Sequence, residues 1–193
     1  MNKKIILSLL LVGCCFMRLS AQQVALKTNA LYWATATMNI GAEVALSKHS
    51  TLSLTANCNP LTIGEKKVHA WFVQPEYRYW FSEKFTRAYL GVNLLGGKCE
   101  VGGFRVPFGL FSSLQGNYYK ATAFAGGVSV GYQFYISPHW NLELMAGVGL
   151  AYVSYYTQPV SGPKVTAPTK TKHILPVPTE VGVSFVYLFN SRK

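Results

Sequence analysis

Residues 141–152 read Asn-Leu-Glu-Leu-Met-Ala-Gly-Val-Gly-Leu-Ala-Tyr, and an apolar side chain holds every even-numbered position. This alternation predicts a β-strand, because successive side chains of a strand point to opposite faces. The predicted strand has one apolar face, made of Leu142, Leu144, Ala146, Val148, Leu150 and Tyr152. Its other face carries Asn141, Glu143, Met145, Gly147, Gly149 and Ala151.

The same period of two recurs along the chain. It is clear at residues 51–59, in 71–81, where Gln74, Glu76 and Arg78 form the polar side, and from Glu180 onward. It is weaker but readable at Val24–Trp33, Asn39–Leu46, Ala88–Lys98 and Ala121–Ile136. Together these segments predict about eight antiparallel strands in one domain that spans residues 22–193.

The character of the two faces predicts a membrane barrel. The polar faces are Gly-rich and sparsely charged, and the apolar faces end in aromatic residues, as the girdles of outer-membrane barrels do. These aromatic residues are Tyr32 and Trp33, Trp71, Tyr79 to Phe81, Trp140, Tyr152, and Phe185 to Phe189. We therefore expect an all-β fold, a single transmembrane antiparallel up-and-down β-barrel of about eight strands. A water-soluble sandwich or lipocalin-like barrel also alternates and is the alternative.

The first 21 residues have the order of a secretory signal peptide. Lys3 and Lys4 precede an apolar stretch, Ile5 to Val12, and Ala21 offers a small residue before the expected cleavage. The alternative is lipoprotein processing at Cys14, since residues 11–14 resemble a lipobox. Cleavage after Ala21 lowers the formal charge from +11 to +8. The expected location is the outer membrane of a Gram-negative cell, which excludes nucleic acid as a partner.

The lengths of the connections predict the orientation of the barrel. Ser47–Ser50, Ser82–Arg87 and Ser137–Trp140 are short, whereas Pro60–Ala70, Gly102–Lys120 and Thr157–Pro178 are long. Short turns of such barrels face the periplasm and long loops face outward. The outer loops would present basic residues to the phosphates of lipopolysaccharide, or simply to solvent. These residues are Lys66, Lys67, Arg105, Lys120, Lys164, Lys170 and Lys172.

Most of the charged residues in the predicted strands occupy positions that would face the interior of the barrel. A charge on the lipid face costs about 2–4 kcal/mol near the midplane for Lys or Arg, and an eight-stranded barrel is just wide enough to be filled by side chains. We therefore predict a polar network that plugs the lumen; a narrow channel for small solutes is the alternative. The network residues are Lys27, Glu43, Glu76, Arg78, Glu143 and Glu180.

No catalytic, metal or cofactor motif is recognisable, and we do not expect an enzyme. The candidates for modification of lipid A are His69 and His173 with Ser112, Ser113 or Ser161, and none stands in a motif. The glycine pairs at 96–97 and 102–103 lie in or beside strands, not in a phosphate-binding loop. Cys58 and Cys99 could form a disulfide in an oxidising compartment, although an intervening strand would separate them.

Four strings carry a resemblance to a known family: Leu26–Tyr32, Val73–Trp80, Val106–Phe111 and His139–Glu143. They resemble a domain-of-unknown-function family of small outer-membrane barrels from Bacteroides-type bacteria, over about Val24 to Phe189. The resemblance implies an OmpA/OmpX-like barrel without a peptidoglycan-binding domain, and no established activity. It also suggests a role beside fimbria-type surface complexes. Residues 180–187 resemble the C-terminal signal for the barrel assembly machinery, although four residues follow Phe189.

Overall fold

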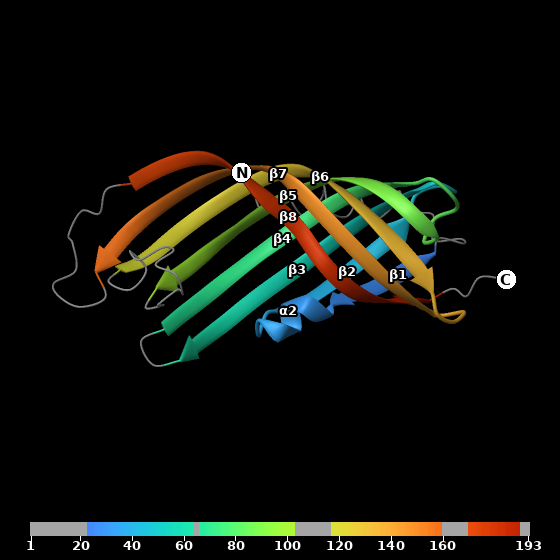
Figure 1. Ribbon diagram of the computed structural model, residues 1–193, viewed down its shortest axis with the longest axis horizontal. Helices are drawn as coiled ribbons and strands as arrows, with labels where there is room; N and C mark the ends of the chain where they lie inside the picture. Colours follow the sequence, from blue (N-terminus) through green and yellow to red (C-terminus); the bar gives the residue numbers. More distant parts are fainter. Residues whose placement is uncertain (1–22, 64–65, 103–116, 160–169, 190–193) are drawn as a thin grey trace, which may run out of the picture.

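The computed structural model describes residues 23–63, 66–102, 117–159 and 170–189. These residues form eight strands and one short helix (Figure 1). The strands are β1 (Val24–Asn29), β2 (Met38–Ala45), β3 (Ser50–Ile63), β4 (Lys66–Trp80), β5 (Arg87–Gly102), β6 (Asn117–Tyr135), β7 (Trp140–Pro159) and β8 (Lys170–Leu188). The helix, α2, spans Ala30–Ala34.

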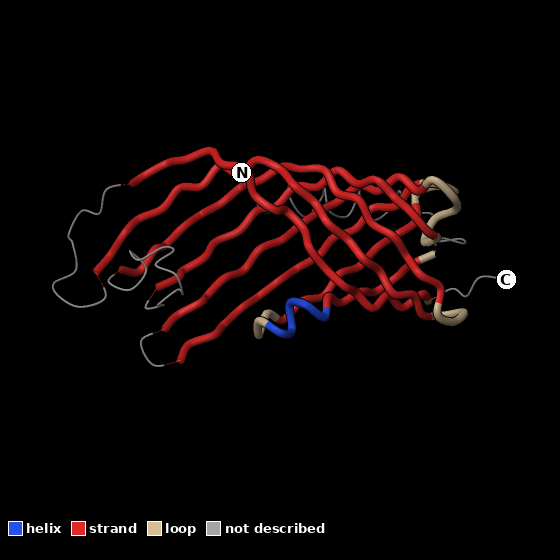
Figure 2. The backbone as a smooth tube through the Cα atoms, in the orientation of Figure 1, coloured by secondary structure: helices blue, strands red, loops and turns tan. Residues whose placement is uncertain are grey.

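The strands close into a single antiparallel barrel. Each strand pairs with its neighbours in chain order, and β1 pairs with β8 to complete the cylinder, with Leu26 opposite Tyr187. The predicted all-β fold, an antiparallel up-and-down barrel of eight strands, is therefore confirmed. Three tight connections, residues 46–49, 81–86 and 136–139, lie together at one end, which we call the turn end (Figure 2). Within the described ranges, no helix has the length and apolarity that crossing a membrane would require.

Along most of the barrel wall, polar side chains face the lumen and apolar side chains face outward. Glu143 is fully buried in the lumen, whereas the adjacent Leu144 is 42% exposed on the outer surface. The outward-facing positions of residues 38–44, 52–58, 71–79, 90–96, 124–134, 142–152 and 181–187 carry no charged residue. This arrangement is the inverse of a water-soluble barrel, which buries its apolar face.

The first strand is shorter than the alternation predicted. We expected Val24–Trp33, but β1 ends at Asn29, whose side chain accepts a hydrogen bond from Leu31 N at 3.0 Å and caps α2. Short polar side chains favour such caps because they satisfy an otherwise unpaired helical N–H. Tyr32 and Trp33 therefore lie on a helix rather than at the end of a strand.

Strands β3 to β8 continue well past the ends of β1 and β2 (Figure 1). Pairing with β2 ends at Cys58 of β3, and pairing with β1 ends at Ser184 of β8. Among the described residues, 59–63 and 170–180 therefore have no strand partner on one side and form open edges of a six-stranded sheet. The side chain of Asn29 caps the adjoining backbone of β8, since it donates to Val181 O and accepts from Val183 N. We call the part of this sheet beyond the ends of β1 and β2 the extension.

The extension corrects the prediction of long outer loops. Residues predicted as the loop Pro60–Ala70 form paired strands up to Ile63 and from Lys66. Strand β6 begins at Asn117, and β8 begins at Lys170 rather than near Glu180. Pro60, Pro176 and Pro178 fall within the predicted loops Pro60–Ala70 and Thr157–Pro178 but lie on the edge strands β3 and β8, where a missing N–H is tolerated.

Candidate functional site

The centre of the lumen is organised around Arg78 of β4. Its Nη1 atom lies 2.9 Å from Glu43 Oε2 and 2.8 Å from Glu143 Oε1. Its Nε atom donates to Glu76 Oε2 at 2.6 Å, and Glu180 Oε1 lies 3.9 Å from Nη2. One guanidinium thus contacts carboxylates from β2, β4, β7 and β8, and so ties opposite walls of the barrel together.

Hydrogen bonds from neighbouring side chains hold these carboxylates in place. Thr51 donates to Glu43 at 2.6 Å, and Tyr89 donates to Glu143 at 2.6 Å, with Gln133 as a second donor to Glu143. Ser129 donates to Glu76. Lys27 Nζ lies 3.6 Å from Glu43 Oε2. Charge-assisted hydrogen bonds of this kind offset part of the cost of burying ions.

An aromatic cluster closes the lumen at the turn end. Trp80, Phe85 and Tyr89 are almost fully buried, and the rings of Phe85 and Tyr89 lie 6.0 Å and 4.8 Å from that of Trp80. Phe85 reaches in from the turn with a left-handed φ of 59°, a conformation that bulky residues rarely adopt. Its carbonyl accepts a hydrogen bond from Asn141 at 3.1 Å.

The opposite end of the lumen narrows beneath α2. A void of about 20 Å³ lies among side chains that include Lys27, Asn57 and Glu180, which is enough for about one water molecule. Tyr32 also lines the void, and its ring meets Phe72 edge-on at 6.1 Å. Burial raises the pKa of the Tyr32 phenol, and the nearby Glu180 raises it further.

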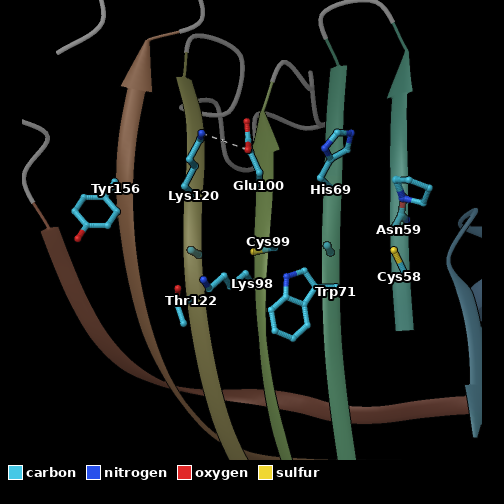
Figure 3. Close-up of a pocket in the computed structure, with 13 residues that line it drawn as sticks. Cys58, Asn59, His69, Trp71, Lys98, Cys99, Glu100, Lys120, Thr122 and Tyr156 are labelled. Atoms are coloured by element: carbon cyan, nitrogen blue, oxygen red, sulfur yellow. Dashed lines mark ion pairs between the residues drawn. The ribbon is translucent and has the colours of Figure 1, made fainter. Parts of the chain in front are cut away.

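A groove of about 500 Å³ lies on the outer face of β3–β7, at the base of the extension (Figure 3). Two rows of paired residues cross it. In the first, Trp71 of β4 lies opposite Lys98 of β5, which lies opposite Thr122 of β6. The second row runs His69, Glu100, Lys120 and Tyr156.

Charge in the groove is mainly on its lysines. Lys120 Nζ lies 3.5 Å from Glu100 Oε2, in a pair that is partly open to solvent. Among the described residues, none forms an ion pair with Lys98. The groove therefore offers an exposed indole, at Trp71, next to ammonium groups.

A family model described as "Protein of unknown function (DUF3575)" matches residues 5–189. The chain belongs to this family. No curated protein and no solved structure shows significant similarity to it. The prediction of an uncharacterised family is thereby confirmed, while the OmpA/OmpX-like character and the Bacteroides-type origin stay predictions. Since the family carries no assigned activity, the function has to be inferred from the geometry.

The structure brings the six predicted lumen residues of this family member together. Lys27, Glu43, Glu76, Arg78, Glu143 and Glu180 are all buried and share the ion pairs described above. The aromatic cluster was missed. We had assigned Trp80 to an outer girdle with Tyr79 and Phe81, but strict alternation from Arg78 places it inside, and this signal was present in the sequence.

The predicted basic loop residues are mostly on strands. Lys66 and Lys67 lie on β4, Lys120 on β6, and Lys170 and Lys172 on β8. Arg105 and Lys164 fall outside the described residues. Lys98, which also lines the groove, was not among the predicted basic residues, because it ends the predicted strand Ala88–Lys98 rather than lying in a predicted loop.

The remaining candidates are scattered. Cys58 and Cys99 are free thiols, and their registers on β3 and β5, on either side of β4, place them on opposite faces of the sheet. The disulfide that the sequence left open is therefore not formed, and the separation by an intervening strand is as expected. His69 lies in the outer groove, and His173 stacks on Tyr155 at 6.0 Å. Ser112, Ser113 and Ser161 fall outside the described residues.

Proposed function

We propose that this protein is an outer-membrane β-barrel with a sealed lumen that acts as a structural or surface-interaction protein through its extension. The proposal includes export by a cleaved signal peptide, at residues 1–21, and no catalytic role. The turn end would face the periplasm, and the extension would face the outside of the cell. Insertion would depend on the barrel assembly machinery.

The observation that carries the proposal is the distribution of charge across the barrel wall. The outward-facing positions between the turn end and the extension are uncharged, and many of them are large and exposed, such as Leu54, Val128 and Leu150. The outward side chains of β7 from Leu142 to Tyr152 cover the 9–11 residues that a tilted strand needs to cross a bilayer. Such a surface in water would be a strong aggregation liability.

The filled lumen disfavours the alternative of a solute channel. The aromatic cluster closes one end, and the Arg78 network occupies the centre. Moving an ion through this space would require separating Arg78 from its carboxylates, at a cost of about 3–5 kcal/mol for a broken buried pair. Function is therefore assigned to the extension, which would contact lipopolysaccharide or a partner such as a fimbria-type surface complex.

Cell fractionation and planar-bilayer recording test the proposal together. The full-length precursor should yield a mature protein in the outer-membrane fraction that dissolves only with detergent. The pure protein should give no steady conductance in a planar bilayer. Solubility without detergent would refute the membrane assignment. Reproducible single-channel steps would instead favour the channel.

A further inference from the structure

The outer groove lies at the boundary between two kinds of surface. The row of residues directly beneath it is uncharged and paired in register: Ala56, Val73, Gly96, Phe124, Tyr152 and Ile174. The first row above it carries Lys98 on β5 and Lys172 on β8, and the next row carries the Glu100–Lys120 pair of β5 and β6. If the barrel spans a membrane, this boundary falls at the level of the lipid head groups.

The side chains of the groove suit an amphiphile with a negative charge. Trp71 is half exposed, and an indole at a membrane interface contacts apolar chains while its N–H reaches polar groups. Lys98 and Lys120 lie on adjacent strands at diagonal positions, which are about 7–8 Å apart between Cα atoms. Two flexible ammonium groups at this spacing can converge on one phosphate, provided that Lys120 turns from its partly exposed ion pair with Glu100 toward the ligand.

The geometry points to a binding site for a phosphorylated glycolipid of the surrounding outer leaflet. Its phosphate would lie between Lys98 and Lys120, and an acyl chain would run down past Trp71 onto the apolar row. The volume of about 500 Å³ is within the usual range for small-molecule sites. This inference rests on the proposed function, because only a membrane-embedded barrel brings the groove to the level of the head groups.

A lipid suits the groove better than a soluble anion, because the groove is continuous with the apolar outer surface of the barrel. The lower border of the groove merges with the uncharged outer surface without a polar rim, whereas a site for a soluble anion would need none of that apolar border. Lys98, which has no ion pair among the described residues, and the partly exposed Lys120 supply the positive charge for the phosphate, as basic residues do at anionic membrane surfaces.

Native mass spectrometry of the full-length mature protein in detergent tests the site. The two probes are bisphosphorylated lipid A and the same lipid with its phosphates removed. The wild type should prefer the phosphorylated lipid. Lys98→Gln and Lys120→Gln should each weaken that binding by roughly fivefold, whereas Lys48→Gln, which removes an equal charge at the turn end, should leave it unchanged. Trp71→Ala should weaken the binding of both lipids.

Two results would overturn the site. One is equal binding of the two lipids by the wild type, or equal binding of the phosphorylated lipid by Lys98→Gln and Lys48→Gln. The other is a disulfide-linked dimer through Cys58 in membranes of a Cys99→Ser strain, since a second copy would then occupy the groove. A heat-dependent shift in electrophoretic mobility verifies that each variant is folded.

Failure of the lipid site and failure of the proposed membrane location give different results. A wild-type protein that fractionates with the outer membrane but shows no lipid preference removes the site and leaves the barrel in place. A protein that dissolves without detergent would rule out both the lipid site and the proposed membrane barrel.

Discussion

Arg78 is the residue on which the interior of the barrel depends most. Its side chain is fully buried, contacts three carboxylates within 2.9 Å and lies 4.3 Å above the ring of Tyr89. Burying an arginine is costly, and only the convergence of several carboxylates makes it favourable. The planar guanidinium suits this position because its donors point in several fixed directions at once.

Replacing Arg78 should therefore be far more damaging than replacing an exposed arginine. Arg78→Met leaves Glu43, Glu76 and Glu143 buried without their cation, and we expect a loss of about 3–5 kcal/mol in the free energy of unfolding. Urea unfolding in lipid vesicles measures it. Arg87→Met, at an exposed position beside a turn, is the matched control and should change stability by less than about 0.5 kcal/mol.

The same experiment has an internal check. Adding Glu43→Gln and Glu143→Gln to Arg78→Met removes two of the buried carboxylates that lack a cation, so part of the lost stability should return. A triple variant less stable than Arg78→Met alone would mean that the carboxylates, not the arginine, hold the network together.

Gly131 is required by close packing inside the barrel. A Cβ atom at this position would lie 2.4 Å from the Tyr89 ring. The hydroxyl group of Tyr89 donates to Glu143, and its ring packs on Trp80. Gly131→Ala should destabilise the barrel by about 1–3 kcal/mol, measured by the same unfolding assay. Gly126→Ala, where the nearest side-chain atom would be 3.4 Å away, should cost much less. Equal losses would contradict the packing argument.

At the scale of the element, the open edges of β3 and β8 carry prolines in a specific orientation. Pro176 and Pro178 pair with β7 although they lack an N–H, so each must occupy a position where its nitrogen faces away from β7. Pro60 of β3 pairs with His69 of β4, so its nitrogen must likewise face away from β4. The prolines thus remove hydrogen-bond donors from edges that could otherwise recruit another strand.

Restoring those donors should promote self-association. The double variant Pro176→Val and Pro178→Val adds two N–H groups along the open edge of β8, and we expect a shift from monomer toward dimer or larger species in detergent. Light scattering coupled to size-exclusion chromatography measures the mass.

Pro75→Val is the matched control for edge pairing. Pro75 lies within the sheet, and the β4–β5 ladder skips it between Val73 and Glu76. Its replacement would add a donor toward β5 and none at an open edge. Association of both variants to the same extent would show that the edge prolines have no protective role.

The strand residues of the extension were predicted as loops, and the edge strands show why that prediction was wrong. Pro176 and Pro178 belong to a run of five prolines between Pro159 and Pro178, which indicates a loop when that segment is read alone. The meaning of a proline in a strand depends on whether another strand lies on its N–H side, and that depends on how far β1 and β2 extend. The local sequence of β3 or β8 does not contain this information.

At the scale of the whole molecule, the barrel has a closed end and an open extension. The turn end is sealed by the aromatic cluster, while β3–β8 project beyond β1, β2 and α2 (Figure 1). In the proposed membrane setting, a barrel with one sealed end would present the extension on only one side of the membrane. Its orientation therefore decides which partners it meets.

Cysteine labelling tests the orientation. In a Cys58→Ser and Cys99→Ser background, Lys120→Cys in the groove should react with a membrane-impermeant maleimide on intact cells. Lys48→Cys at the turn end should react only after the outer membrane is permeabilised. The reverse pattern would place the extension in the periplasm and would rule out contact with an outer-leaflet lipid.

The sequence by itself determined the strand number, the antiparallel barrel and the inward phase of residues such as Glu76, Arg78 and Glu143. These follow from a period of two, a local property of the backbone that survives in any surroundings. Only the tertiary structure decided where the strands stop, which carboxylates share Arg78, and that Trp71, Lys98 and Lys120 meet in one groove. Those outcomes depend on register between strands distant in the chain, because cross-strand neighbours are set by closure of the whole sheet rather than by any one segment.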